Sequence, residues 1–400
     1  MRILLVDDEP FMLKLLANQL ARLGCDDVVA FEHAEDALVE LERDAAAVSL
    51  VLCDLQMPNM DGVELLRHLA RLGYEGGLVL VSGEDRRILR TVQNLATAHG
   101  LNVVGCLHKP VSLEQLQQVL AGTISRSATA VRASRKSYDA EELRRAIAGG
   151  ELVNHYQPKV EIATGSVAGV ETLVRWRHPQ DGMVYPDQFI STAEQHGLIH
   201  DLTRAVLTDA LRQARVWHDM GLDLHVAVNV SMDNLGALDF PDFVARAVAK
   251  VGIPLTSLVL EVTESRLMQD LLAPLDILTR LRLKHIGLSI DDFGTGHSSL
   301  AQLRDIPFDE LKVDRGFIHG AGRDAAMRAI VEASLAMARQ LDMRTVAEGV
   351  EDEADWNLVR SAGCDIAQGY YIAKPMPAEA LAGWITAWNS GRPTLAASVA

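Results

Sequence analysis

Seven strand-like runs in the second part of the chain each carry a polar side chain near the end of an otherwise apolar stretch. In chain order these side chains are Glu171, Asn229, Glu261, Asp291 with Asp292, Lys312, Glu348 and Gln368. If the runs are parallel strands of a closed barrel, their carboxyl ends meet at one mouth, where barrel enzymes carry their active sites. We therefore expect these groups to form one cluster.

Five carboxylates in such a cluster repel one another too strongly to be buried without cations. Oxygen ligands without clustered His or Cys favour Mg²⁺ or Mn²⁺ over zinc. Two ions about 3.5–4 Å apart, bridged by one Asp, would activate a water and stabilise the attacking and leaving oxygens of a phosphodiester displacement. Lys312 could hold that water or screen developing charge. Each residue alone also suits a solvated strand end or a turn, so the prediction rests on the ordered set.

A second set of polar residues follows strand-like runs in the first part of the chain. Asp7 and Asp8 follow the first run, Asp54 the third, Ser82 the fourth and Lys109 the fifth. In an open parallel sheet these ends share one edge, where ligands bind. Asp8 and Asp54, with a backbone carbonyl, could hold Mg²⁺, and Asp54 could attack a phosphoryl donor. Ser82 and Lys109 could then bind the phosphoryl oxygens.

The alternation of apolar runs with amphipathic helical stretches predicts an α/β fold for both parts. Residues 1–122 predict a doubly wound, flavodoxin-like parallel sheet, with helices such as Asp61–Leu72 between the strands. Its five strands are expected near Ile3–Val6, Asp27–Ala30, Leu50–Cys53, Leu78–Val81 and Val103–Cys106. Residues 123–138 are small, polar and locally basic, which is typical of a linker. The alternation returns over residues 139–388, whose length suits an α/β barrel, and residues 389–400 form a tail without pattern.

The composition is that of an ordinary soluble globular protein. A net charge of −16 argues against binding of a nucleic-acid polymer by the bulk surface and leaves a small anionic ligand open. The N-terminus has no signal-peptide core and no apolar run reaches membrane-span length, so we expect a cytoplasmic protein without membrane contact. The dispersed cysteines are interpreted as reduced core residues. No helical His pair has metal-ligand spacing, and we interpret the histidines as structural or surface groups, including His155, His178, His225 and His319.

Residues 1–122 resemble a response regulator receiver domain. The motifs that carry the resemblance are Asp7-Asp8, Asp54-Leu-Gln-Met-Pro-Asn-Met-Asp-Gly62, Ser82 and Lys109-Pro110. The resemblance implies one bound Mg²⁺ and phosphorylation of Asp54 by a sensor histidine kinase in a two-component pathway. Receivers usually carry an aromatic residue near the end of the fifth strand, where this chain has Cys106. The usual relay between a Thr or Ser and that aromatic residue therefore lacks one member here.

Residues 139–388 resemble an EAL-type cyclic di-GMP phosphodiesterase domain. The motifs that carry this resemblance are Glu171-Thr-Leu-Val-Arg175, Asn229-Val-Ser231, Glu261-Val-Thr-Glu264, Asp291-Asp-Phe-Gly-Thr-Gly296, Leu311-Lys-Val-Asp314, Ala347-Glu-Gly-Val-Glu351 and Gln368-Gly-Tyr370. It implies a TIM-like (β/α)₈ barrel whose first strand, Leu152–Lys159, is antiparallel. It also implies hydrolysis of cyclic di-GMP to linear 5′-pGpG by barrels that assemble as homodimers or higher homo-oligomers. Thr172 and His297 depart from the family pattern, and neither removes a ligand.

The same resemblance implies roles for individual residues. One metal ion would be held by Glu171, Asn229, Glu261 and Asp291, and the other by Asp291, Asp292 and Glu348. Lys312 would contact the catalytic water, and Glu264 would anchor the loop that begins at Asp292. Substrate contacts would come from Gln157, Arg175, Asp314, Glu351 and Gln368. The forked guanidinium of Arg175 suits a phosphate better than a lysine would.

Two other functions remain open. A barrel of this type could bind cyclic di-GMP as a sensor without cleaving it, although such sensors usually lack the ligands that this chain keeps. An unrelated barrel could use acidic ligands and a lysine base, but Arg175 and Gln157 suit a phosphate and a nucleobase better than a small acid. Formation of pGpG from cyclic di-GMP with Mg²⁺ would separate these functions.

Overall fold

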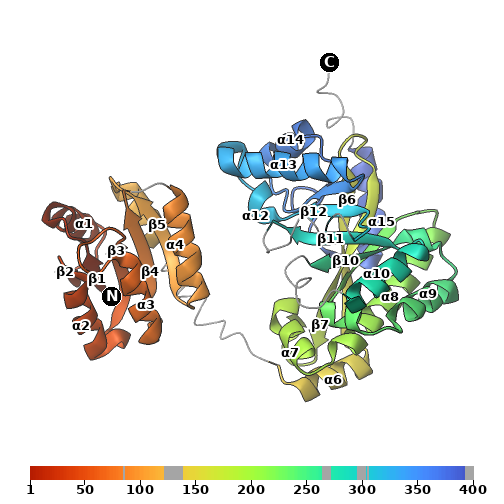
Figure 1. Ribbon diagram of the computed structural model, residues 1–400, viewed down its shortest axis with the longest axis horizontal. Coiled ribbons are helices and arrows are strands. Elements are labelled where there is room, and N and C mark those ends of the chain that lie inside the picture. The colour runs from red at the N-terminus through yellow and green to blue at the C-terminus, as the bar shows by residue number, and fades with distance from the viewer. Residues whose placement is uncertain (84–85, 121–137, 264–271, 295–302, 304–305, 392–400) are drawn as a thin grey trace. The chain divides into compact units, whose positions relative to one another are not determined.

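The computed structural model describes residues 1–83, 86–120, 138–263, 272–294, 303 and 306–391 (Figure 1). The chain forms two compact units, Met1–Arg135 and Lys136–Ala400. The predicted loop residues Glu264 and His297, and the predicted linker up to residue 137, lie outside the described residues. Among the helices that are described, none is both long enough and apolar enough to cross a membrane.

The first unit is a five-stranded parallel sheet with the strand order β2-β1-β3-β4-β5. Its strands are β1 (Arg2–Val6), β2 (Val28–Phe31), β3 (Val48–Asp54), β4 (Gly77–Ser82) and β5 (Asn102–His108). Its helices are α1 (Pro10–Arg22), α2 (Ala34–Asp44), α3 (Gly62–Arg71), α4 (Arg86–Ala98) and a helical stretch at 113–120. The predicted doubly wound fold, its five strands and the helix near Asp61–Leu72 are confirmed, with small shifts at the element ends.

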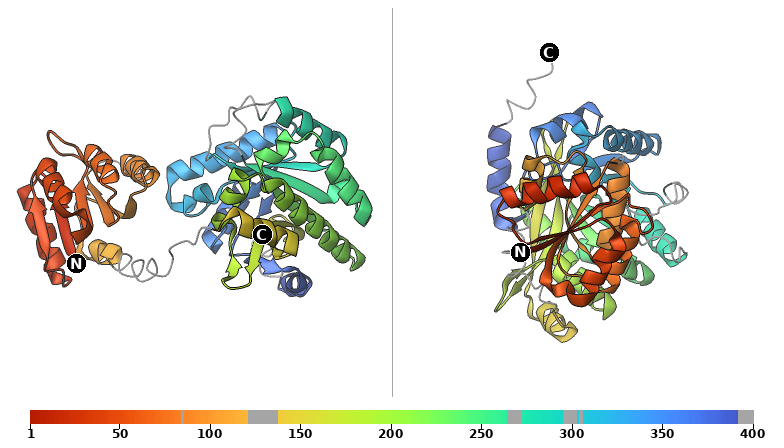
Figure 2. Two further views of the ribbon diagram at one scale, coloured as in Figure 1. Left: turned by 90° about the horizontal axis from the view of Figure 1, so that it is seen from below. Right: turned by 90° about the vertical axis from the view of Figure 1, so that its left-hand side faces the viewer.

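Burial explains why these runs become central strands. Side chains of β3 and β4 are buried on both faces of the sheet except at one position of β3, as expected for a parallel sheet covered by helices. One core cluster joins the sheet to α2, α3 and α4, and a second joins its other face to α1 and the 113–120 helix (Figures 1 and 2). Two covered faces leave the carboxyl edge of the sheet for chemistry.

The second unit is a closed barrel of eight strands. They are β6 (Leu152–Glu161), β7 (Val167–His178), β9 (His225–Val230), β10 (Leu258–Thr263), β11 (Gly287–Phe293), β12 (Glu310–Val313), β13 (Arg344–Ala347) and β14 (Ile366–Ala367). β6 pairs antiparallel with β7 and β14, and the other neighbouring pairs are parallel. The predicted (β/α)₈ barrel with an antiparallel first strand is confirmed.

Helices surround this barrel (Figure 2). They are α6 (Ala140–Gly149), α7 (Ile190–Gln195), α8 (Ile199–Asp219), α9 (Phe240–Val251), α10 (Leu272–Leu283), α12 (Arg315–Ile318), α13 (Ala325–Gln340), α14 (Glu353–Ser361) and α15 (Ala378–Ser390). Two short strands, β8 (Gly182–Val184) and β15 (Met376–Pro377), pair with β7 and β6. The helices and strands share one apolar core, which holds the strand ends in place.

Two boundaries of the barrel unit differ from the sequence prediction. Tyr138, assigned to the linker, is buried, and its ring centroid lies 4.7 Å from that of Trp176. The aromatic contact therefore makes Tyr138 part of the folded unit. At the other end α15 continues to Ser390 instead of ending at Trp388, whose indole N–H donates to the carbonyl of Gly165. The remainder of the predicted tail, from residue 392, is not described.

Candidate active site

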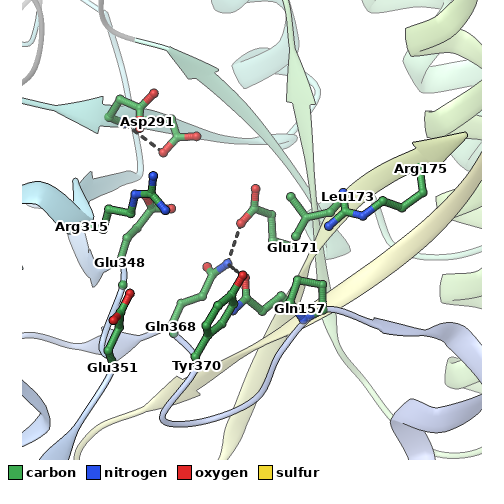
Figure 3. A pocket seen from close by; sticks show the side chains of 14 residues that line it. Gln157, Glu171, Leu173, Arg175, Asp291, Arg315, Glu348, Glu351, Gln368 and Tyr370 are labelled. Atoms are coloured by element: carbon green, nitrogen blue, oxygen red, sulfur yellow. Dashed lines mark hydrogen bonds between the residues drawn. The ribbon is translucent and has the colours of Figure 1, made fainter. Parts of the chain in front are cut away.

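The predicted strand-end residues lie together at the mouth of the barrel. They come from five barrel strands, β7, β9, β10, β11 and β12, and from the segments after β13 and β14. The residues are Glu171, Asn229, Glu261, Asp291, Asp292, Lys312, Glu348 and Gln368. The parallel register sets Glu261 beside Asn229 on the neighbouring strand. In Figure 3, Glu171, Glu348 and Asp291 surround a common space.

The carboxylates form two overlapping groups. Ligand oxygens of Glu171, Glu261 and Asp291 lie within 4.8 Å of one another, and those of Asp291, Asp292 and Glu348 do the same. Asp291 therefore belongs to both groups, as the bridging carboxylate predicted from the sequence would.

The backbone of Asp292 explains how two consecutive carboxylates reach the same place. Successive side chains of a regular strand point to opposite faces. Asp292 has a φ of 55°, and the pairing register of β11 with β12 shifts between Ile290 and Phe293. This irregularity interrupts the alternation, so that Asp291 and Asp292 both contribute to one acidic group.

Lys312 lies at the centre of the acidic cluster and is fully buried. Its Nζ lies 2.9 Å from Glu261 Oε2, 2.9 Å from Asp291 Oδ1 and 2.6 Å from Glu348 Oε1. Burial opposes the charge, but the surrounding carboxylates raise the pKa of Lys312 well above its ordinary value. Lys312 thus places a positive charge among the carboxylates.

One ammonium does not balance the whole cluster. Burial raises the pKa of Glu348 to about 8 and, together with the charge of Asp291, raises the pKa of Asp292 to about 6. Burial also raises the pKa of Glu171. Glu261 differs: burial opposes its ionisation, but two nearby lysines lower its pKa to about 2. The protein therefore does not balance the negative charge of all these carboxylates, and oxygen ligands of this kind fit Mg²⁺ or Mn²⁺.

The raised pKa of Glu348 predicts an unusual pH dependence of metal-free stability. Its ordinary value is 4.5 and its folded value is about 8, so its stabilising protonation is complete below pH 4.5 and is lost as pH rises through 8. The melting temperature in EDTA should therefore fall between about pH 4.5 and pH 8, and Mg²⁺ should reverse the fall because it binds the deprotonated ligand. Glu348→Gln should flatten the EDTA curve. A flat wild-type curve would contradict the prediction.

A cavity of about 320 Å³ opens beside the carboxylates. Its lining residues include Gln157, Glu171, Arg175, Asp291, Asp292, Arg315, Glu348, Glu351, Gln368 and Tyr370 (Figure 3). The guanidinium of Arg175 lies 5.0 Å from the centre of the Tyr185 ring, a cation–π contact that holds it at the rim. Gln368 Nε2 donates to Glu171 Oε2 at 2.5 Å and to Gln157 Oε1 at 3.0 Å. The cavity thus joins the carboxylates to the predicted substrate residues.

Two of the predicted barrel-site residues are found neither at the cavity nor in the carboxylate cluster. Asp314 is not among the described residues that line it, and its carboxylate instead caps α12 by accepting from the backbone N–H of Gly316 at 2.8 Å. Glu264 lies outside the described residues.

Several residues of the site were not predicted from the sequence. Arg315 and Tyr370 line the cavity, and Lys159 contacts Glu261 from within the barrel. Gly349, with a φ of 64°, permits the close approach of Arg315, because a Cβ there would lie 2.2 Å from Arg315 Cβ. Lys159 carried a usable signal, since a lysine inside an otherwise buried strand needs a partner.

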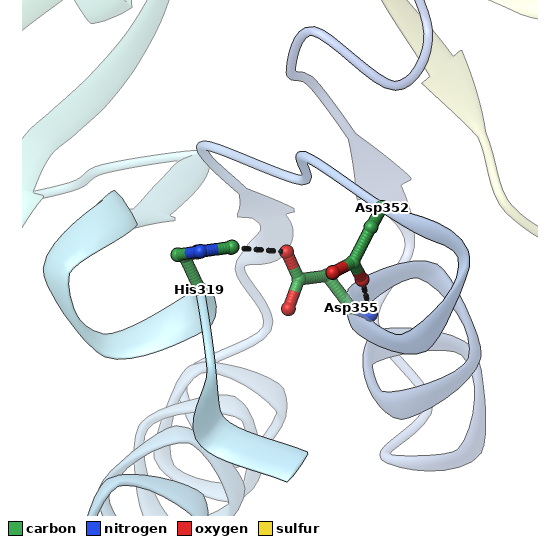
Figure 4. Close-up of side chains that lie close together, drawn as sticks. All are labelled: His319, Asp352 and Asp355. Carbon is green, nitrogen blue, oxygen red and sulfur yellow. Dashed lines mark hydrogen bonds and ion pairs between the residues drawn. The ribbon is translucent and has the colours of Figure 1, made fainter. Parts of the chain in front are cut away.

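His319, Asp352 and Asp355 form a separate group of possible metal ligands (Figure 4). Asp355 Oδ2 lies 2.9 Å from His319 Nδ1 and accepts from the backbone N–H of Glu351 at 3.1 Å. Asp352 caps α14 by accepting from the backbone N–H of Asp355. These contacts order the loop that carries Glu351 and agree with the interpretation of His319 as a structural group.

In the first unit, the predicted residues also meet at the carboxyl edge of the sheet. Ligand oxygens of Asp7, Asp8 and Asp54 lie within 4.8 Å of one another, and Lys109 Nζ lies 2.7 Å from Asp54 Oδ2. Burial raises the pKa of Asp7 despite the nearby Lys109 ammonium. Ser82 ends β4 and is buried.

The switch position of this unit has a polar contact in place of an aromatic ring. Cys106 on β5 is half-buried, and its Sγ lies 3.5 Å from Gln93 Oε1 on α4. The contact links β5 to α4, the helix that follows Ser82 along the chain.

Comparison with known proteins agrees with this geometry. Residues 140–375 match the EAL domain family, and residues 3–121 match the response regulator receiver domain family. The cyclic di-GMP phosphodiesterase RocR of Pseudomonas aeruginosa is 31% identical over 379 residues, which cover 94% of this chain and 96% of RocR.

A second relative resembles the barrel alone. The bifunctional diguanylate cyclase/cyclic di-GMP phosphodiesterase MucR of Pseudomonas aeruginosa is 45% identical over 241 residues, 60% of this chain, and the chain spans 35% of MucR. The solved structure of the PaMucR phosphodiesterase in complex with c-di-GMP has 45% identity and a TM-score of 0.58, and the match covers 60% of this chain and 98% of that chain.

The EAL match spans more than half of the chain, and the match to RocR runs through both compact units. The parallel sheet of the first unit and the barrel with an antiparallel first strand agree with the two families matched. This chain therefore belongs to the EAL domain family and carries a response regulator receiver domain ahead of its barrel.

Proposed function

We propose that this protein hydrolyses cyclic di-GMP to linear 5′-pGpG and that phosphorylation of its receiver domain sets the rate. The observation that carries the proposal is the pair of acidic groups that share Asp291, beside a cavity lined by Arg175 and Gln157. RocR is a cyclic di-GMP phosphodiesterase, and PaMucR was solved with c-di-GMP, which supports the same substrate class.

The donor set suits two divalent ions of the Mg²⁺ or Mn²⁺ type. Glu171, Glu261 and Asp291 would hold one ion, together with the side-chain oxygen of Asn229. The side-chain nitrogen of Asn229 already donates to Glu171 Oε1 at 2.9 Å, which leaves its oxygen to the ion. The second group, which contains Asp291, Asp292 and Glu348, would hold the other. When bound, such a pair activates a water and stabilises the attacking and leaving oxygens of a phosphodiester.

The chain's own residues would orient the substrate for cleavage. Arg175 would bind a phosphate through its guanidinium, and Gln157 and Glu351 would contact a nucleobase from the cavity wall. In the reaction a water oxygen bonds to phosphorus and the bond from phosphorus to a ribose 3′ oxygen breaks. The 3′ oxygen takes up a proton, and the product is linear 5′-pGpG.

Lys312 must lose one of its carboxylate contacts before it can act on the catalytic water. An ammonium has three N–H donors, and Lys312 Nζ already has close contacts with Glu261, Asp291 and Glu348. It can donate to the attacking water only after one carboxylate gives up its contact. Cation binding to Asp291 or Glu348 would release that donor, so Lys312 would become available when the site is loaded.

Chromatography of the products from cyclic di-GMP and the purified protein tests this function. With Mg²⁺ or Mn²⁺ we expect pGpG, and with Ca²⁺ we expect turnover at least about tenfold lower, because Ca²⁺ prefers more ligands at longer distances. Bound but uncleaved cyclic di-GMP would favour a sensor instead. Equal rates with Mg²⁺ and Ca²⁺ would argue against catalysis by two small ions.

Asp54→Asn is expected to change the hydrolysis rate and its response to a phosphodonor without abolishing activity. Asp54 contacts Lys109 in the receiver unit, whereas the acidic site belongs to the barrel unit. Rates with and without acetyl phosphate check this, and Glu64→Gln, on the exposed surface of α3, is the matched control. A folded Asp54→Asn protein without any hydrolysis would contradict simple modulation.

The physiological partners follow from the same proposal. A sensor histidine kinase would donate the phosphoryl group to Asp54, and the barrels would pair as homodimers. Light scattering would then give twice the chain mass of 43.6 kDa.

A further inference from the structure

The interior of the barrel holds a second buried lysine, Lys159 on β6, which the scheme above does not use. Its side chain is 6% exposed, and its Nζ donates to Glu261 Oε1 at 2.5 Å and to Glu310 Oε1 at 3.2 Å. Glu310, at the start of β12, also accepts from Ser289 Oγ at 3.0 Å. These three residues form a polar network around Glu261.

The strand register places Lys159 one layer below the cavity. Gln157 pairs with Glu171 and Lys159 pairs with Gly169, the position two residues earlier on β7. Residues two apart on a strand share a face, so Lys159 points into the barrel as Gln157 does. Its long side chain then reaches Glu261 without occupying the cavity, which Gln157 lines.

Glu261 is held at both carboxylate oxygens. Its Oε1 accepts from Lys159 and its Oε2 accepts from Lys312 at 2.9 Å, and the residue is fully buried. A carboxylate fixed at both oxygens cannot turn about its last bond without breaking a charge-assisted hydrogen bond. Lys312 also contacts Asp291 and Glu348, whereas the second contact of Lys159 is Glu310, which belongs to neither acidic group.

We propose that Lys159 is a positioning residue for the metal site: it fixes the orientation of Glu261 as a ligand, and Glu310 with Ser289 holds Lys159 in place. The inference rests on the proposed two-metal function. Partners that orient a ligand from behind typically contribute tenfold to a hundredfold in metal affinity or activity. A competing role is simple neutralisation of the buried Glu310 carboxylate.

Four variants separate these two roles: Lys159→Met, Glu310→Gln, the double variant of both, and Lys250→Met as a control at an exposed lysine of α9. Mn²⁺ affinity is measured without substrate by electron paramagnetic resonance, and the Mg²⁺ concentration for half-maximal hydrolysis is measured separately. Lys159→Met should weaken Mn²⁺ binding by about 10- to 100-fold and raise the Mg²⁺ requirement in parallel. KM for cyclic di-GMP at saturating Mg²⁺ should stay within about threefold, because Lys159 is not at the cavity.

The double variant decides between positioning and neutralisation. It has no unpaired Glu310 carboxylate, so a Lys159 that only neutralised Glu310 would no longer be needed. We expect the double variant to bind Mn²⁺ as weakly as Lys159→Met. Glu310→Gln should lie between that variant and wild type, because it loosens Lys159, and Lys250→Met should match wild type. Recovery of wild-type Mn²⁺ affinity in the double variant would overturn the inference, as would a Lys159→Met protein with unchanged affinity.

Folding and function are controlled in the same experiment. If Lys159→Met does not fold, the double variant is compared with Glu310→Gln, and equal Mn²⁺ affinities of those two would overturn the inference. A wild-type protein that neither binds Mn²⁺ nor forms pGpG would instead refute the proposed function.

Discussion

Asp291→Asn is expected to reduce hydrolysis of cyclic di-GMP by about 10³-fold or more. Asp291 is the carboxylate common to both acidic groups, so its loss removes a ligand from both proposed ions. Metal ions typically stabilise a transition state by several kcal/mol, and each 1.36 kcal/mol corresponds to a factor of ten in rate. Steady-state rates at saturating Mg²⁺ measure the loss.

Thermal shift gives this prediction a second readout. A ligand that binds the folded state raises stability in proportion to the logarithm of its concentration over Kd, so Mn²⁺ should raise the melting temperature of the wild type and not that of Asp291→Asn. Asp292→Asn is the matched comparison, because Asp292 belongs to one group and should lose less activity. An Asp291→Asn protein that still binds two Mn²⁺ ions would refute the bridging role.

Lys312→Met is expected to reduce turnover by about 10²- to 10³-fold while metal binding is kept or strengthened. Turnover should fall because the variant removes a hydrogen-bond donor from the reacting centre. The variant removes a buried positive charge that lies 2.9 Å from Asp291 and 2.6 Å from Glu348, so repulsion of an incoming cation falls. Turnover and Mn²⁺ affinity should therefore move in opposite directions, unlike in Asp291→Asn.

The same substitution should make stability dependent on metal. Removing one partner of a buried ionic network leaves its carboxylates uncompensated, and we expect a loss of about 3–5 kcal/mol in EDTA. Mn²⁺ should restore much of that loss by mass action. Chemical denaturation with and without Mn²⁺ measures both quantities. Near-wild-type turnover, or Mn²⁺ binding that weakens together with turnover, would contradict the proposed role of Lys312.

The fold could be predicted from the sequence because short apolar runs alternate with amphipathic helical stretches along the chain. The five receiver strands are near-continuous apolar runs, and their period and spacing predicted a parallel sheet. The domain boundaries were harder to predict. Tyr138 was assigned to the linker because the residues before it are small and polar, whereas its ring packs against Trp176, which is far away in the sequence. Local pattern does not encode such contacts.

The carboxylate site was also readable, because polar residues at the ends of parallel strands converge at the mouth of a barrel. Lys159 and Glu310 were not recognised, because their partnership depends on how β6 and β12 are staggered around the barrel. Asp314 was predicted as a substrate contact, and it is not among the described residues that line the cavity. It follows Lys312 closely, yet the end of β12 turns it into the cap of α12.

Anomalous scattering from a Mn²⁺-soaked crystal of the wild-type protein tests the two-metal assignment most directly. The predicted result is two peaks at the barrel mouth, one in contact with Glu171, Glu261 and Asp291 and the other in contact with Asp291, Asp292 and Glu348. A single peak, or peaks that do not share Asp291, would contradict the assignment.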